Sequence, residues 1–99
     1  MLYTIICTDQ KNGLELRKQN RLAHLDYLKT LGDRLFSAGP TLTENGNQPT
    51  GSIIIAKFDS FKEALHFANE DPYSKAGLFE ETIIKRFRQM MMLFMNSGK

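Results

Sequence analysis

The chain has 99 residues, of which 41% are hydrophobic and 24% charged, a balance typical of one globular domain with a single core. Thirteen basic and eleven acidic residues give a net charge of +2, and because the basic residues are scattered, no nucleic acid partner is expected. No stretch reaches the roughly 20 apolar residues of a membrane span. The single cysteine, Cys7, cannot form a disulfide within the chain. We therefore predict one domain over residues 1–99, a cytoplasmic location and no membrane partner.

The first half of the chain predicts two strands and a helix between them. Residues 2–8 are apolar and β-branched, which is typical of a buried strand. Leucines at positions 22, 25, 28 and 31 recur every three residues, and Gly32 then provides a stop, so residues 14–31 predict a helix. Residues 34–38 predict a strand. We expect its pairing to end at Gly39 and Pro40, because a proline nitrogen cannot donate to a neighbouring strand.

The second half begins with a polar segment, residues 41–51, which predicts a hairpin loop leading into a strand over residues 52–58. Ser60 and Glu63 have the spacing of a capping box and start a second helix. Its predicted apolar face carries four residues, Phe61, Ala64, Leu65 and Ala68. The helix must end before Asp71 and Pro72, because a proline disfavours helical geometry in the preceding residue.

The last part of the chain is ambiguous. Residues 73–78 predict a short connection. For residues 79–88, helical spacing links Ile83 and Phe87 with Met91 and Met95 beyond them, whereas the adjacent Thr82, Ile83 and Ile84 favour a strand. We predict a strand, which completes the order β-α-β-β-α-β. This order is typical of an α+β, ferredoxin-like antiparallel sheet with two helices on one face.

The strand sequences place apolar groups on both faces of this sheet. Residues 53–55 are three isoleucines, and residues 5–7 are Ile-Ile-Cys, whereas a sheet with one wet face alternates apolar and polar residues. Because two helices cover only one face, we expect a homodimer through the sheet face. The alternative is that some of these apolar residues are simply exposed.

Three polar residues of the first helix, Arg17, Arg21 and His24, share the arc of its apolar residues and should face the sheet. Their burial without partners costs a few kcal/mol each, so we expect a polar cavity or acceptors nearby. Asp71 is the candidate partner of His24, because Pro72 restricts its backbone. A carboxylate bound to one imidazole nitrogen leaves the other free to exchange protons. The alternatives are a structural core histidine and a plain helix end.

The sequence contains no motif for nucleophilic, nucleotide-dependent or metal-dependent catalysis. The sequence has no Gly-x-Ser-x-Gly, no glycine-rich phosphate loop and no His/Cys cluster with metal-ligand spacing. The other histidine, His66, lies opposite the apolar face of its helix and should be solvated. We therefore predict no cofactor and no metal site.

Several short motifs resemble the YciI-like (YCII-related) family, in order and spacing, from residue 1 to about residue 87. They are Arg21-x-x-His24-Leu25-x-x-Leu28, Ala38-Gly39-Pro40, Gly51-Ser52 and Asp71-Pro72-Tyr73. The resemblance implies a dimeric α+β barrel fold, related to muconolactone isomerase-like proteins, and it places His24 and Asp71 at the family's proposed acid/base dyad. One branch of the family is similar to a dehydrochlorinase that acts on a chlorinated hydroxyhydroquinone.

These residues predict a small cofactor-independent lyase or isomerase that acts on an aromatic or lactone-like substrate. His24 would move the proton and Asp71 would orient the imidazole. Arg21 would attract an anionic group of the substrate, and Tyr73 would offer a ring face or a hydroxyl. The alternative is a non-catalytic small-molecule-binding or stress-related dimer. RNA binding would require aromatic residues interleaved with basic ones on the central strands, and residues 52–58 are mostly isoleucine.

An apolar, methionine-rich extension over about residues 88–99 lies beyond the family resemblance. Because methionine adapts to irregular surfaces, we expect this tail to pack in the core or at the dimer interface. The alternative is that it covers the mouth of the cavity.

Overall fold

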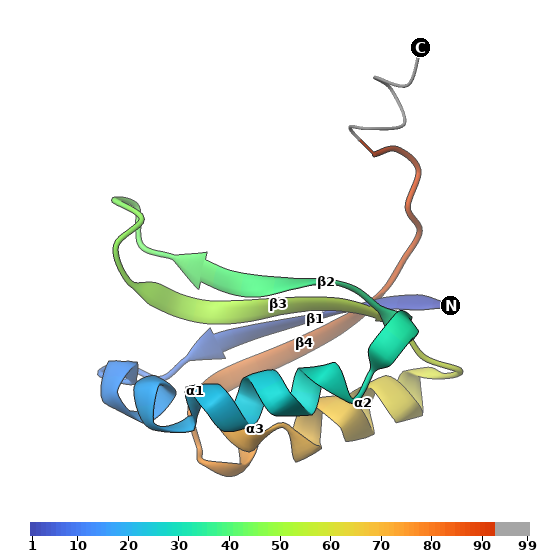
Figure 1. Ribbon diagram of the computed structural model, residues 1–99. Coiled ribbons are helices and arrows are strands. Elements are labelled where there is room, and N and C mark those ends of the chain that lie inside the picture. Colours follow the sequence, from blue (N-terminus) through green and yellow to red (C-terminus); the bar gives the residue numbers. More distant parts are fainter. Residues whose placement is uncertain (93–99) are drawn as a thin grey trace.

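Within residues 1–92, the part of the chain that this computed structural model describes, the strands form one antiparallel sheet and all helices lie on one of its faces (Figure 1). The elements are β1 (Leu2–Asp9), α1 (Leu14–Lys29), the 3-10 turn η1 (Gly32–Arg34), β2 (Leu35–Leu42), β3 (Pro49–Lys57), α2 (Phe61–Glu70), α3 (Pro72–Lys75) and β4 (Phe79–Phe87). The strand order is β2-β3-β1-β4. This arrangement confirms the predicted ferredoxin-like α+β fold, including a strand after residue 78. None of the described helices is long and apolar enough to cross a membrane.

Strand β2 continues past Pro40, where we predicted that pairing would stop. Pro40 lies opposite Ser52, and the ladder goes on to Leu42 opposite Pro49. The prediction was wrong because β2 is at the edge of the described sheet. A proline is tolerated there, since the nitrogen that cannot donate can face the open side of the strand.

Helix α1 packs on the sheet through Arg17, His24 and Leu28, which are all buried. The predicted leucine stripe is wrong at Leu22, which is 75% exposed, whereas Leu31 is buried just beyond the helix. At about 100° per residue, a three-residue repeat drifts by about 60° at each step, so these two leucines point in opposite directions. Of the polar arc that we predicted to face the sheet, Arg17 and His24 are buried, whereas Arg21 is exposed.

Helix α2 begins as predicted, with the Ser60 side chain accepting a hydrogen bond from the backbone N–H of Glu63 at 3.2 Å. Its buried face carries Ala64, Phe67 and Ala68. The prediction that Phe61 and Leu65 share this face was wrong, because both are at least 40% exposed. Phe67 is the member that we missed, and it completes an i, i+3, i+4 face with the two alanines.

The predicted connection after Pro72 contains a short helix, α3, rather than an irregular loop. Asp71 caps it by accepting a hydrogen bond from the backbone N–H of Tyr73 at 2.9 Å, and Pro72 occupies the first helical turn. Gly77, with a φ of 81°, then ends the turn in a conformation that favours glycine. The capped turn carries Tyr73 into the interior, where it is 2% exposed.

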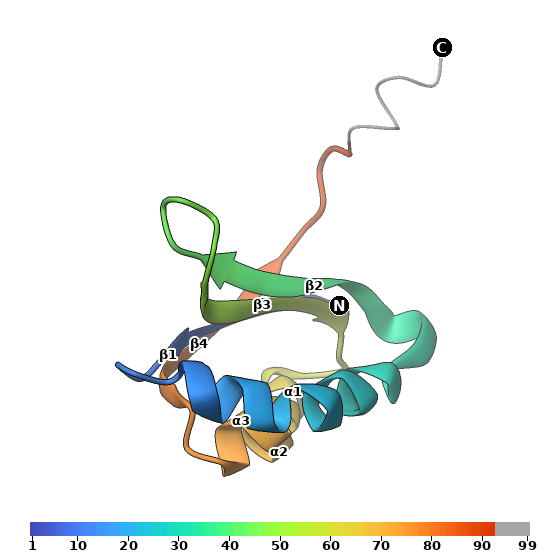
Figure 2. The ribbon, with the colours of Figure 1, turned by 60° about the vertical axis from the view of Figure 1, so that its left-hand side comes forward.

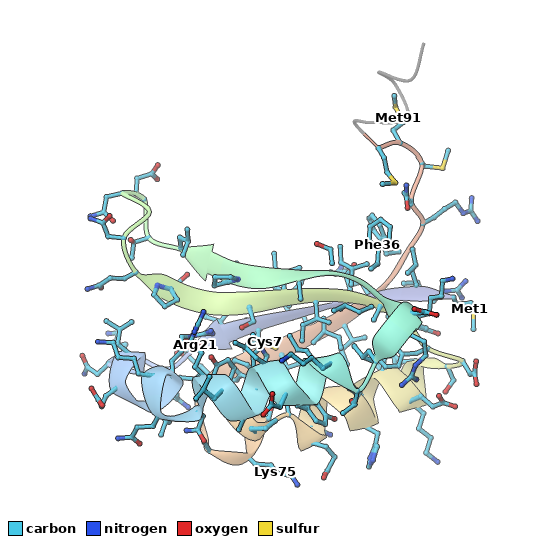
Figure 3. The ribbon with its side chains drawn as sticks, viewed as in Figure 1. Met1, Cys7, Arg21, Phe36, Lys75 and Met91 are labelled. Atoms are coloured by element: carbon cyan, nitrogen blue, oxygen red, sulfur yellow. The ribbon has the colours of Figure 1, made fainter. Side chains whose placement is uncertain are left out.

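Large apolar side chains stand on the sheet face that points away from the helices. Ile53 and Ile83 both lie beside Ile6 in register, and they are 36% and 38% exposed. Phe36 stands on the same side (Figure 3) and is 41% exposed. Residues 88–92 leave the sheet on this side too (Figure 1), and Met91 is exposed. Residues 93–99 of the predicted apolar extension lie outside the described residues.

Candidate active site

The structure joins the predicted pair, His24 and Asp71. The Nδ1 atom of His24 lies 2.9 Å from each carboxylate oxygen of Asp71. Both residues are buried, His24 on α1 and Asp71 at the junction of α2 and α3. The extended backbone of Asp71, with φ −59° and ψ 132°, is what a following proline favours, and it directs the carboxylate toward α1.

The second nitrogen of the imidazole, Nε2, opens into a cavity. No buried side-chain nitrogen or oxygen among the described residues lacks a hydrogen-bond partner. The hydrogen bonds of His24 use Nδ1 alone, so Nε2 must be accessible. His24 lines a cavity of about 220 Å³ between α1 and the strands β2 and β3. A carboxylate-bound Nδ1 with an open Nε2 is the arrangement that a general acid/base histidine needs.

Tyr73 fixes the plane of the imidazole. The two rings stack with centroids 4.0 Å apart and an interplanar angle of 17°. The guanidinium carbon of Arg17 lies 4.6 Å from the centroid of the Tyr73 ring. Burial raises the pKa of the Tyr73 hydroxyl, and the charge of Arg17 offsets that effect only in part, so the phenol is neutral at ordinary pH. Tyr73 also lines the cavity, as its predicted role in substrate binding requires.

A second buried polar cluster, which the sequence analysis did not identify as part of the site, lies beside this pair. Arg17 donates two hydrogen bonds to the carboxylate of Asp9, at 2.8 and 2.9 Å, and one to the hydroxyl of Ser52, at 3.0 Å. Burial lowers the pKa of Arg17, but the hydrogen bonds and charge of Asp9 outweigh it, so the pKa is raised overall. The signals in the sequence were the inward position of Arg17 and the Gly51-Ser52 motif.

The lining of the cavity is apolar with a cationic rim. Leu25, Leu28 and Ile54 provide apolar walls, and Lys18 and Arg21 join Arg17 along one side. No carboxylate is among its lining residues in the described part of the chain. Arg21 is exposed, and its side chain extends from α1 toward β3 (Figure 3). The cavity therefore favours a small, largely apolar ligand with negative charge.

All four predicted site residues come together here. His24, Arg21 and Tyr73 line the cavity, and Asp71 lies behind the imidazole. His66 is exposed, as predicted, and belongs to a separate surface hollow beside α2. Figure 2 shows α1 lying beneath β2 and β3, and the residues that line the cavity come mainly from these three elements. Among residues 1–92 there is no group of three or more His, Cys, Asp or Glu residues placed to hold a metal ion.

Known proteins are similar to this chain in sequence, and a solved structure is similar to it in fold. Protein YciI of Escherichia coli O6:H1 is 40% identical over 97 residues, covering 91% of this chain and 99% of that protein. An uncharacterized protein of Haemophilus influenzae is 37% identical with the same coverage. A solved structure, 5-chloro-2-hydroxyhydroquinone dehydrochlorinase (TftG) from Burkholderia phenoliruptrix in complex with 2,5-dihydroxybenzoquinone, has a TM-score of 0.83 and 36% identity. That match covers 91% of this chain and 96% of the other.

These similarities extend over most of the chain. The structural match confirms that the protomer has the predicted fold of the dimeric α+β barrel proteins. It also shows that small-molecule lyase activity occurs on a closely similar structure, since TftG is a dehydrochlorinase. Residues 1–88 match the model of the YCII-related domain, and the chain belongs to the YCII-related family.

Proposed function

We propose that the protein is a cofactor-independent lyase that moves a proton on a small aromatic substrate, with His24 as the acid/base and Asp71 as its orienting partner. The observation that carries this proposal is the buried imidazole itself. Its Nδ1 is held by Asp71 at 2.9 Å, while Nε2 opens into a cavity. An aspartate in this position selects the tautomer with Nδ1–H and stabilises the imidazolium that forms when Nε2 takes a proton.

The substrate class follows from the lining of the cavity. A volume of about 220 Å³ with leucine and isoleucine walls suits a single small ring. Arg21 and Lys18 at the rim would attract ionised ring hydroxyls or a carboxylate. TftG acts on 5-chloro-2-hydroxyhydroquinone and is described with 2,5-dihydroxybenzoquinone bound, and both compounds are small oxygenated rings of this kind. We take these compounds as the first substrate and ligand to test.

The reaction that fits these groups is the loss of HCl. Nε2 of His24 takes the proton of a ring hydroxyl, and the O–H bonding pair stays on oxygen. The imidazolium returns this proton to the carbon that carries chlorine, which forms a C–H bond and a ring carbonyl. A second hydroxyl then loses its proton to Nε2, and chloride leaves with the C–Cl bonding pair. The products are a hydroxyquinone, a proton and chloride, so no oxidant or cofactor is consumed.

The test is chloride release from 5-chloro-2-hydroxyhydroquinone under anaerobic conditions, with wild type, His24→Asn and Asp71→Asn. We expect the His24 variant to lose at least about 100-fold in kcat, the usual contribution of a general acid/base group. The Asp71 variant should also lose activity, although its amide oxygen can still cap α3. His66→Asn is the matched control, because it removes an exposed imidazole on α2 and should leave kcat unchanged.

Two results would count against the proposal. Equal chloride release by wild type and His24→Asn would remove the histidine from the chemistry. Binding of 2,5-dihydroxybenzoquinone by wild type without any turnover would favour the alternative, a protein of the same family that binds a small molecule and does not transform it.

A further inference from the structure

The hydroxyl of Ser52 is a buried polar group that takes no part in the mechanism proposed for His24 and Asp71. Ser52 lies on β3, is 3% exposed and lines the same cavity as His24. It accepts a hydrogen bond from Arg17 at 3.0 Å. An arginine side chain has donors only, so Ser52 must be the acceptor, and its own O–H proton is left over. Among the described residues no acceptor receives that proton.

We propose that Ser52 donates this O–H to the ring oxygen of the substrate that gains negative charge when His24 moves a proton. This inference rests on the proposed function, because it names the group that stabilises the other end of the same proton transfer. The hydroxyl oxygen of Ser52 accepts a hydrogen bond from Arg17, while its O–H proton has no acceptor within residues 1–92. This bond orients the hydroxyl before the substrate binds. Such a donor stabilises the charged intermediate without reorganising during the reaction.

Arg17 and Asp9 are the positioning residues of this donor. The two parallel hydrogen bonds from Arg17 to Asp9 fix the plane of the guanidinium group. A third hydrogen bond from Arg17 is donated to the hydroxyl of Ser52. Because Asp9 balances the charge of Arg17, the guanidinium orients and polarises the hydroxyl without acting as the main anion-binding group. The cationic groups at the rim, Arg21 and Lys18, remain available for the rest of the ligand.

The placement of Ser52 restricts the substrate. It faces the cavity from the sheet, whereas His24 faces it from α1. The substrate must therefore present an ionisable proton toward the helix side and a conjugated oxygen toward the sheet side. Rings with two or more hydroxyls and quinones that carry a hydroxyl meet this requirement, and a hydrocarbon ring or an isolated alcohol does not. We infer that the site selects rings with at least one carbonyl or phenolate oxygen.

The experiment compares Ser52→Ala, which removes the donor, with Ser52→Thr, which keeps a hydroxyl. Thr50→Ala is the matched control, because it removes an exposed hydroxyl from the same strand outside the cavity. For each variant we would measure the melting temperature, the Kd for 2,5-dihydroxybenzoquinone by its visible absorbance, and kcat and KM for chloride release. The first measurement identifies any variant that fails to fold.

In Ser52→Ala we expect kcat to fall about 100-fold, the usual effect of removing one preorganised donor to an oxyanion. The Kd for the quinone should rise about tenfold, as expected for one hydrogen bond to a charged group. Ser52→Thr should restore most of the kcat and most of the affinity for the quinone. Thr50→Ala should match wild type in both measurements. A purely structural role of Ser52 would lower the melting temperature without these changes in kcat and in the Kd for the quinone.

The outcomes separate this inference from the proposed function. If wild type releases chloride and Ser52→Ala matches it in kcat and in Kd, the Ser52 inference is wrong and the His24 mechanism stands. If wild type binds the quinone without turnover, and Ser52→Ala weakens binding while Ser52→Thr restores it, the donor role stands and the lyase proposal falls. If wild type does not bind the quinone at all, the inferred substrate class is wrong.

Discussion

Asp71 serves two neighbours at once. Its carboxylate accepts from Nδ1 of His24 and from the backbone N–H of Tyr73, each at 2.9 Å. Asp71→Ala leaves both buried donors unpaired, so we expect the free energy of unfolding to fall by about 1–3 kcal/mol. Asp71→Asn keeps an acceptor for the backbone N–H of Tyr73, so its free energy of unfolding should fall by less. Urea unfolding of the three proteins measures the difference, and an alanine variant as stable as wild type would contradict this account.

Cys7 should be chemically inert in the folded protein. Burial raises the pKa of its thiol from 9.0 to about 11, and the side chain is 3% exposed. We therefore expect no reaction with a thiol reagent at pH 8 until denaturant is added. Because the folded-state pKa is the higher one, the neutral thiol contributes stability that is complete below pH 9 and is lost as the pH rises toward 11. A folded protein that reacts at the rate of a free thiol would disprove this.

The residues of the site were predictable to different degrees. His24 and Arg21 follow from the polar arc of a helix, and Asp71 from the proline after it, because these signals are local in sequence. Ser52 was not identified, since its role depends on a bond to Arg17, which lies 35 residues away. Asp9 was not identified for the same reason. Contacts between distant segments have no periodic pattern that a single sequence can reveal.

At the scale of elements, Gly51 is required by the packing of β3. An added Cβ would collide with the carbonyl oxygen of Cys7 and lie 2.8 Å from the Thr41 hydroxyl. We expect Gly51→Ala to lower the free energy of unfolding by about 1–3 kcal/mol, the usual cost of overpacking. Gly39→Ala on β2 is the matched control, since nothing lies within 4 Å of a Cβ there. Chemical unfolding in which both variants behave alike would contradict the prediction.

The elements themselves were largely predictable, because strands and helices depend on local pattern and punctuation. The capping residue Ser60 and the stop at Pro72 were read correctly. The errors concern tertiary position. Pro40 was read as the end of a strand because nothing in the local sequence indicates that β2 is an edge strand. The helix that carries Tyr73 has four residues, too few for a hydrophobic period to be recognised.

At the scale of the whole molecule, the apolar sheet face is the unexplained surface. Ile53 and Ile83, which both lie beside Ile6 in register, are exposed. Phe36 is exposed as well and lies on the side away from the helices (Figure 3). We propose that a second copy of the chain packs on this face, since isolated proteins rarely leave a large apolar patch in water. Light scattering should then give twice the 11.3 kDa mass of one chain. A monomer at all concentrations would contradict the proposal.

A charge on this face should separate the copies. Ile83→Lys places an ammonium group on β4 beside Ile6, which in turn lies beside Ile53, so we expect it to shift the mass toward the monomer. Leu22→Lys is the control, because Leu22 is 75% exposed on α1 and lies on the opposite layer of the molecule. Dissociation by both variants, or by neither, would locate the interface elsewhere.

The central claim is that His24 presents Nε2 to a ligand while Asp71 holds Nδ1. Long-range ¹H–¹⁵N NMR of the two imidazoles, with and without 2,5-dihydroxybenzoquinone, tests it most directly. We predict that His24 is the tautomer with Nδ1–H, that its Nε2 resonance moves when the quinone is added, and that His66 does not respond. A His24 spectrum that matches free imidazole and is unchanged by the quinone would contradict the account.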